Sequence, residues 1–228
     1  LLQRAIAEHI ENTVAHFSEK VTVWDVVNEP MDVFGPDLAN YYFYQVMGED
    51  YISESFKRVN QTAPMAKKVL NEQFFAYRNR RAKNFLALVR RLQDQDIRID
   101  AIGIQSHLMF NEPDIDDFAW FLDQIKQLGL SVDITELDIR LGLFRRAKSP
   151  LQAQANAYHQ VVSTALSSGI CTGITVWGIS DTHTWLDHIP PMKLKAFQPN
   201  NPLLFDQTLE PKPAYHAVAQ GLKEGKQV

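Results

Sequence analysis

Several short apolar runs of this sequence end in side chains that can perform acid–base chemistry or bind a polar ligand. They include two glutamates, an aspartate, a histidine, three amides and two indoles. Two carboxyl groups that share a cavity can act as proton donor and nucleophile, while aromatic faces stack on sugar rings. Gathered in one place, these groups would form a glycosidase site, whereas singly each glutamate could be a helix-start residue or a solvated charge. The residues are Asn28, Glu29, Asn71, Gln105, His107, Glu136, Asp138, Trp177 and Trp185.

The elements that must position these groups alternate along the chain. Runs rich in β-branched residues predict strands, and segments with an apolar residue every three or four positions predict helices. Such alternation favours a parallel sheet covered by helices, in which the carboxyl ends of the strands meet at one edge. The predicted strands span residues 21–27, 68–71, 101–105, 132–136 and 174–178, and the predicted helices span residues 4–17, 80–93, 116–128 and 214–222.

Alternation within the strands predicts which side chains point into the fold. Successive side chains of a strand face opposite sides of the sheet. We expect the cavity face to carry two of the carboxylates together with amides and an imidazole, and we expect Asp25 to be buried and paired. The predicted inward sets are Asp25, Val27 and Glu29; Gly103, Gln105 and His107; and Ile134, Glu136 and Asp138.

The spacing of the strands bears on the fold class. The predicted strands begin about 38 residues apart, the length of one βα unit. A closed (β/α)8 barrel needs eight such units in about 250 residues, so the 228 residues come close to a whole barrel in length. Yet the pattern holds one helix and five βα units, and the six prolines after Gly178 argue against further central strands. The fold class is therefore an α/β TIM-barrel type that is incomplete, with about five parallel strands.

Composition excludes several other classes of function. The net charge of −4 and the lack of a basic run argue against a nucleic-acid partner. No apolar stretch reaches the about 18 residues of a membrane span, so no membrane partner is expected. A single cysteine, Cys171, excludes an internal disulfide and a Cys-based zinc site. Asp181, His183 and His188 are spaced too irregularly to predict a metal site, so we expect neither metal nor cofactor.

Five separated motifs occur in the order found in one known family. They are VTVWDVVNEP, AIGIQSHL, VDITELDIR, ITVWGISDTHTW and PLLFDQTLEPKPAYHAV. In these motifs the chain resembles family 10 of the glycoside hydrolases, the retaining endo-β-1,4-xylanases. The resemblance implies a (β/α)8 barrel that needs no cofactor. It also implies one catalytic domain over residues 1–228, corresponding to βα units 4 to 8 and lacking the first three.

The resemblance also implies roles for individual residues. Glu29 matches the general acid/base and Glu136 matches the nucleophile, with the two carboxyl groups about 5–5.5 Å apart in a retaining enzyme. Asn28 matches the group that bonds the 2-hydroxyl of the sugar in the −1 subsite. Asn71 and Gln105 line the same region.

A second group of residues is implied to support the nucleophile and the sugar. His107 and Asp138 match a hydrogen-bonded pair that positions and tunes the nucleophile. Trp177 and Trp185 match the indoles that form the floor and wall around the −1 sugar. Family members also carry a lysine, an asparagine, a histidine and a tryptophan near their first three strands, and none of these maps onto this chain. Phe74, Phe75 and Tyr77 replace a loop that is richer in Tyr and Asn, so we assign them no sugar contact.

The implied partner is xylan or a xylo-oligosaccharide. An incomplete arc of strands leaves two open edges, and three outcomes stay open. The native protein is longer, which we favour; another chain supplies the missing strands; or the arc pairs with a copy of itself. Two other functions stay open: a catalytically silent barrel remnant that binds xylo-oligosaccharides, and a related β-glycosidase acting on β-glucan. A polymeric substrate favours an extracellular location, but the chain starts at Leu1 without a visible leader, so the sequence leaves the compartment unknown.

Overall fold

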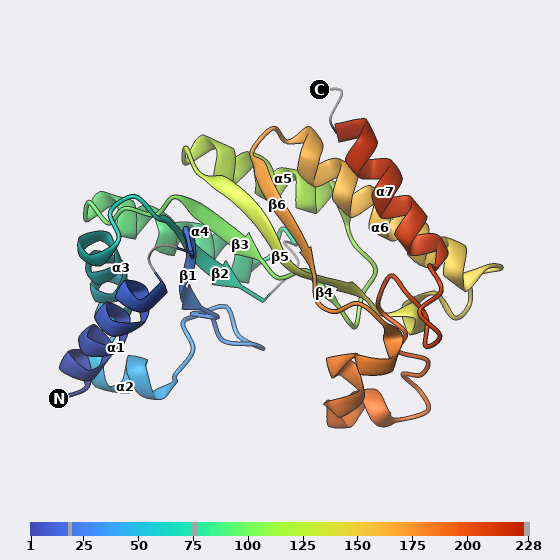
Figure 1. Cartoon of the computed structure of the whole chain (residues 1–228), viewed down its shortest axis with the longest axis horizontal. Coiled ribbons are helices and arrows are strands. Elements are labelled where there is room, and N and C mark those ends of the chain that lie inside the picture. Colours follow the sequence, from blue (N-terminus) through green and yellow to red (C-terminus); the bar gives the residue numbers. More distant parts are fainter. Residues whose placement is uncertain (18–19, 74–76, 226–228) are drawn as a thin grey trace.

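A twisted parallel sheet runs through the molecule, with helices packed against one of its faces (Figure 1). The computed structural model describes residues 1–17, 20–73 and 77–225. Within them the strand order is β1-β2-β3-β5, and both β4 and β6 pair with β5. The five predicted strands are all present within a few residues of their expected bounds, and the short β4 is an addition. The strands are β1 (Val23–Asn28), β2 (Lys67–Glu72), β3 (Ala101–Ile104), β4 (His107–Leu108), β5 (Ser131–Ile139) and β6 (Cys171–Val176).

The helices begin and end at residues whose chemistry favours a boundary. The side chain of Asn79 accepts a hydrogen bond from the amide of Ala82 at the start of α4. Gly129, with a φ of +72°, follows the end of α5 in the left-handed conformation that glycine adopts readily. The α-helices are α1 (Leu2–Phe17), α2 (Tyr42–Met47), α3 (Asp50–Thr62), α4 (Arg80–Asp94), α5 (Ile115–Gln127), α6 (Pro150–Ser167) and α7 (Pro213–Gly225). The 3-10 turns among the described residues are η1 (Leu141–Phe144), η2 (Asp181–His183), η3 (Trp185–His188) and η4 (Pro190–Lys193).

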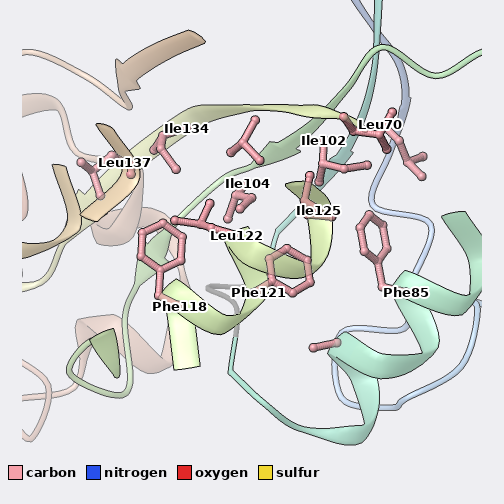
Figure 2. Close-up of a cluster of buried hydrophobic side chains, with 14 of the residues drawn as sticks. Leu70, Phe85, Ile102, Ile104, Phe118, Phe121, Leu122, Ile125, Ile134 and Leu137 are labelled. Carbon is pink, nitrogen blue, oxygen red and sulfur yellow. The ribbon is translucent and has the colours of Figure 1, made fainter. Parts of the chain in front are cut away.

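The hydrophobic core lies between the strands and the helices that cover them. Figure 2 shows Ile102 and Ile104 of β3 pointing toward the aromatic rings of Phe118 and Phe121 on α5. Ile134 of β5 belongs to the same cluster and is 1% exposed. Because successive side chains of a strand alternate, this packing directs the intervening residues to the opposite, concave face of the sheet.

Two strands contain a shift of register that changes which residues face inward. The pairing of β1 with β2 shifts between Asp25 and Val27, and that of β5 with β6 shifts between Ile134 and Leu137. An extra residue at such a bulge reverses the alternation beyond it. Val27 and Ile134 are buried in the core, so their assignment to the inward face was wrong. Asp25 is exposed, so the expectation that it is buried was also wrong.

The concave face of the sheet carries charged and polar side chains. The ammonium of Lys67 lies 2.6 Å from Asp133 Oδ2 and donates to Thr172 Oγ1 at 2.6 Å. The hydroxyl of Thr172 donates in turn to Asp133 Oδ1 at 2.6 Å. Within the described residues β1 and β6 each pair with one neighbouring strand, and no pairing joins them to each other. The arc therefore stays open and presents a polar inner face to water.

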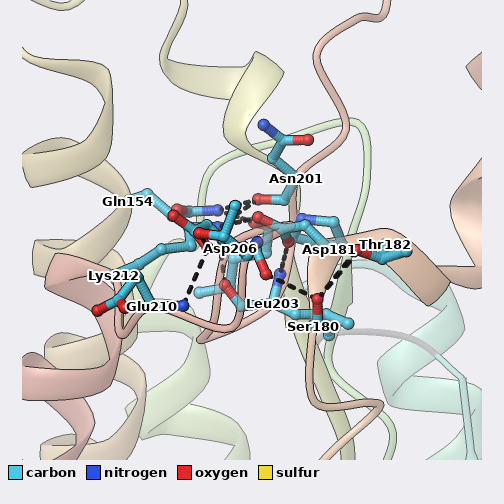
Figure 3. A network of polar contacts seen from close by, with 12 residues as sticks. Gln154, Ser180, Asp181, Thr182, Asn201, Leu203, Asp206, Glu210 and Lys212 are labelled. Carbon is cyan, nitrogen blue, oxygen red and sulfur yellow. Dashed lines mark hydrogen bonds and ion pairs between the residues drawn. The ribbon is translucent and has the colours of Figure 1, made fainter.

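A buried ion pair ties the C-terminal segment to the sheet. Lys212 Nζ donates to Asp181 Oδ2 at 2.9 Å, and to the carbonyls of Asn201 at 2.8 Å and Leu203 at 2.7 Å (Figure 3). Gln154 of α6 donates to the same Asn201 carbonyl. Between β6 and α7 the described chain forms 3-10 turns and isolated bridges, as the prolines predicted. None of the described helices combines the length and apolarity required to cross a bilayer.

Candidate active site

Amide side chains connect the two glutamates singled out in the sequence. Gln105 Nε2 donates to Glu29 Oε1 at 3.0 Å and lies 3.1 Å from Asn28 Oδ1. Asn71 Nδ2 donates to the same Asn28 oxygen at 2.9 Å and lies 3.2 Å from Glu136 Oε1. Gln105 and Asn71 are 2% and 1% exposed, so the surrounding protein holds them in place. The network therefore brings Glu29 and Glu136 to one rim of the sheet.

A second set of contacts supports Glu136 from its other side. His107 Nε2 lies 3.2 Å from Glu136 Oε2, and His107 Nδ1 lies 2.9 Å from Asp138 Oδ1. Trp185 Nε1 donates to Asp138 Oδ2 at 2.6 Å. Burial acts to lower the pKa of His107, but hydrogen bonds and charges from Asp138 and Glu136 outweigh it and raise the pKa to about 9. An imidazolium thus donates from both ring nitrogens to two carboxylates at neutral pH.

Two indoles border the imidazole. The ring of Trp185 lies 4.6 Å from that of His107 between centroids, and the ring of Trp177 lies 6.2 Å away in an edge-on arrangement. Trp177 remains 46% exposed, so much of its ring is open to a ligand. The exposed ring of Trp177 can stack on a sugar, while the indole N–H of Trp185 is engaged with Asp138.

The backbone at the strand ends is specialised for presenting these side chains. Glu29 and Ser106 adopt left-handed conformations, with φ of +53° and +61°, which are uncommon for residues with a Cβ. The amide of Glu29 donates to the Asn71 carbonyl at 2.9 Å, which continues the pairing of β1 with β2 beyond the strand. The Glu136 amide donates likewise to the Gln105 carbonyl at 3.2 Å. These conformations persist because hydrogen bonds on both sides hold them.

The structure joins the residues predicted for the site into one connected set. Trp177 touches it through its ring contact with His107, and each of the others is linked to it by at least one hydrogen bond. This set is Asn28, Glu29, Asn71, Gln105, His107, Glu136, Asp138, Trp177 and Trp185.

Two further residues that sequence reasoning missed also belong to this region. Thr135 Oγ1 lies 2.8 Å from Asn71 Oδ1, and nothing in the sequence marked this threonine. Glu72, the last residue of β2, is 1% exposed, and a charged residue at a buried strand position is a signal that its charge is paired. Phe74 and Phe75 lie outside the described residues. Tyr77 packs against the core and donates to the Glu112 carbonyl.

The arrangement has the chemistry of a two-carboxylate hydrolase. Glu136 is surrounded by donors, the amide of Asn71 and the imidazolium of His107, which stabilise its negative charge. Glu29 accepts from the neutral amide of Gln105 and stays partly exposed at the strand ends, where a ligand can reach it. Two carboxyl groups with different hydrogen-bonding partners thus face one site.

Comparisons with known proteins agree with this geometry. The model of the family described as glycosyl hydrolase family 10 matches residues 1–221. The endo-1,4-beta-xylanase of Geobacillus stearothermophilus is 34% identical across 96% of this chain and 67% of its own length. Endo-1,4-beta-xylanase 5 of Pyricularia oryzae is 33% identical across 96% of this chain and 52% of its own length. The chain thus spans between about half and about two thirds of the length of these relatives.

Solved structures give the same result at the level of the fold. Native xylanase 10B from Thermotoga maritima superposes with a TM-score of 0.90 at 27% identity, covering 100% of this chain and 68% of that one. Xylanase 10B from Thermotoga petrophila, in complex with xylobiose, superposes with a TM-score of 0.86 at 27% identity, covering 96% and 64%. The sheet, its helices and the motifs at its strand ends therefore show that the chain belongs to glycosyl hydrolase family 10.

Proposed function

We propose that this chain carries the site for retaining hydrolysis of internal β-1,4 bonds of xylan, with Glu136 as nucleophile and Glu29 as acid/base. One observation supports these roles above all. Glu136 lies between the His107 imidazolium and the Asn71 amide, while Glu29 is joined to it through neutral amides alone. Two carboxyl groups whose neighbours differ in charge in this way can take the separate roles of acid and nucleophile.

The proposed reaction proceeds in two displacements. A carboxylate oxygen of Glu136 attacks C1 of the bound xylose while the bond to the leaving oxygen breaks, and Glu29 gives its proton to that oxygen. The product is a glycosyl ester on Glu136. The Glu29 carboxylate then takes a proton from water, whose oxygen attacks C1 and releases Glu136. Two inversions at C1 give net retention and return both carboxyl groups to their starting states.

The surrounding side chains support a sugar ligand. The Oδ1 atom of Asn28 already accepts from Asn71 and Gln105, which leaves its Nδ2 group to donate to a sugar hydroxyl. The exposed ring of Trp177 offers a stacking surface beside His107. The xylobiose complex of the Thermotoga petrophila xylanase supports a xylo-oligosaccharide as the ligand.

The open edges of the sheet affect how the domain is defined and what it can associate with. Residues 1–228 form, in this proposal, one catalytic domain that corresponds to βα units 4 to 8 of a barrel. Its free edges would be covered by a second copy or by strands of another chain. A largely apolar groove of about 390 Å³ beside β1 supports such contact. It is lined by Leu2, Ala5, Ile6, His9, Ile10, Val26, Val27, Asn28, Phe43, Tyr51 and Ser55.

The assignment of the nucleophile is tested by Glu136→Ala. The variant lacks the attacking oxygen, so it should not hydrolyse an aryl β-xylobioside, whereas its fold by circular dichroism should be unchanged. Glu54→Ala on α3 serves as the matched control, because Glu54 lies at the surface and pairs with Lys57, and it should retain wild-type turnover. Undiminished hydrolysis by Glu136→Ala would refute the assignment.

The substrate class is tested by the products. Xylan should yield short xylo-oligosaccharides whose anomeric configuration, read by NMR directly after cleavage, is retained. Carboxymethyl-cellulose should not be cleaved at a comparable rate. The same assay is run on a version of the chain extended upstream of Leu1. Turnover by the extended version alone would show that the site needs more of the barrel to be active. Lack of turnover by both versions would support the silent, oligosaccharide-binding alternative.

A further inference from the structure

A carboxylate with no part in the proposed chemistry lies directly behind the acid/base segment. Glu72 follows Asn71 at the end of β2, and alternation points it to the helix side of the sheet. Its Oε2 atom accepts from the amide of Met31 at 3.0 Å. Its Oε1 atom accepts from the amide of Gln73 at 2.7 Å and from Arg81 of α4 at 3.0 Å. Glu72 is therefore a buried carboxyl group that accepts three hydrogen bonds.

The contact with Met31 restrains the segment that carries Glu29. Pro30 has no amide proton, so the Met31 amide is the first donor after Glu29. The amide before this gap, that of Glu29, donates to the Asn71 carbonyl. Asn71 and Glu72, which are adjacent in β2, thus hold segment 29–31 at both of its ends. The first residue of this segment, Glu29, has a φ of +53°. A left-handed residue needs such restraint, because it stores strain that other backbone conformations would release.

Burying this carboxylate costs free energy, and its partners offset the cost. Burial raises the pKa of Glu72 to about 7, against the lowering effect of Arg81 and of the two backbone amides, while the charge of Glu29 raises it further. Tyr51 of α3 also faces this carboxylate, and its pKa of about 12 keeps the phenol neutral. An apolar side chain at position 72 would avoid the cost but would leave the Met31 amide buried without an acceptor.

We propose that Glu72, held by Arg81, is a positioning residue that orients Glu29 for proton transfer by anchoring the backbone amide of Met31. The inference rests on the proposed acid/base role of Glu29. It adds a residue that touches no substrate and acts through the conformation of segment 29–31. Its loss should impair protonation of the leaving group more than attack by Glu136, which β5 holds separately.

The test compares substrates that differ in their need for an acid. A 2,4-dinitrophenyl β-xylobioside has a leaving group that departs without a proton, whereas a phenyl β-xylobioside needs one. Properly placed acid–base catalysis contributes about 10²- to 10⁴-fold. Glu72→Gln should therefore lower kcat/KM for the phenyl substrate about 10-fold or more, and leave it nearly unchanged for the dinitrophenyl substrate. An equal loss for both would show a merely structural role and overturn the proposal.

A matched control removes the charge from a buried ion pair elsewhere. Asp181→Asn weakens the pair with Lys212, which lies away from segment 29–31, so it should change kcat/KM for both substrates by one common factor. Glu72→Asp is the second variant if Glu72→Gln does not fold. It keeps the charge but shortens the side chain by one methylene, so that it cannot reach both amides, and it should show the same preference for the dinitrophenyl substrate.

A readout independent of activity separates this inference from the proposed function. Amide hydrogen exchange at Met31 should accelerate at least about 10-fold in Glu72→Gln, which corresponds to about 1.4 kcal/mol, while exchange at Ile102 in β3 should not change. Unchanged exchange at Met31 would overturn the anchoring even in an active enzyme. If the wild-type chain hydrolyses neither substrate, the proposed function fails, while the exchange result still decides whether Glu72 holds this amide.

Discussion

Single residues set the charge of the site, and His107 shows how. Each of its ring nitrogens faces a carboxylate, so both must donate, and only the imidazolium has two donors. The Trp185 indole occupies the second oxygen of Asp138, which leaves that carboxylate little freedom to turn away. The proton on His107 thus stabilises the folded site as well as the charge of Glu136.

This protonation predicts how the free energy of unfolding depends on pH. The pKa of His107 rises on folding from 6.5 to about 9, so its contribution is complete below pH 6.5 and is lost as the pH rises through 9. A rise of this size corresponds to on the order of 3 kcal/mol. Between pH 6 and pH 9.5 the wild type should lose about that much more unfolding free energy than His107→Gln.

Urea unfolding at the two pH values measures this difference. Glu72 also titrates near neutral pH, but it is present in both proteins and its effect cancels in the comparison. Parallel pH dependence in the wild type and in His107→Gln would show that the imidazole does not take up its proton on folding.

At the scale of elements, neighbouring strands hold the amide network in register. Asn71 on β2 lies opposite Gly103 on β3, and an added Cβ at Gly103 would collide with Asn71 Oδ1. Thr135 on β5 bonds the same oxygen. A glycine is therefore required in β3 so that a side chain from β2 can cross it and reach Glu136.

Gly103→Ala should displace Asn71 and with it the link between Asn28 and Glu136. We expect a loss of about 1–3 kcal/mol in unfolding free energy, as for other overpacked sites. We also expect kcat/KM on xylo-oligosaccharides to fall about 10-fold or more, because the displaced Asn71 amide would no longer donate to Glu136. Gly173→Ala in β6 is the control. The nearest atom to its added Cβ would be Asp133 Oδ1, at 3.2 Å, so the loss of unfolding free energy should be smaller. Equal effects of the two variants would contradict this account.

At the scale of the whole molecule, the described sheet ends in two unpaired edges. Val23 on the outer edge of β1 is 45% exposed, and strand edges of this kind promote association. The polar inner face, with its Lys67–Asp133 ion pair, lowers the cost of leaving the arc open but does not pair these edges. Association of copies is therefore the expected behaviour of this chain in solution.

Sedimentation velocity tests this expectation. The wild-type chain should sediment as a dimer or larger species whose share grows with concentration. Val23→Lys places a charge on the free edge and should shift the population toward the monomer. Val33→Lys, at an exposed position outside any strand, should leave the distribution unchanged. A wild type that remains monomeric at all concentrations would exclude self-association.

Local patterns predicted most of the fold and the membership of the candidate site. The family resemblance and the incomplete barrel class are confirmed by the comparisons and by the parallel arc. The roles of Glu29 and Glu136 remain predictions. Where inference from the sequence failed, the cause was non-local. Val27 and Ile134 were given the wrong face because a bulge depends on the pairing partner, and Glu72 was given no role because one of its donors, the Met31 amide, comes from a segment far along the chain.

The sequence by itself determined five of the strands, four of the helices and which polar residues stand at the strand ends, because these follow from periodicity and from the chemistry of neighbouring residues. It did not predict β4, α2, α3 or α6. Only the tertiary structure decided which oxygens of Glu136 and Asp138 the two ring nitrogens of His107 contact, and that Asn71 crosses Gly103. These features depend on register between strands and on contacts between residues 29 or more positions apart. Such contacts arise from packing, which no local pattern encodes.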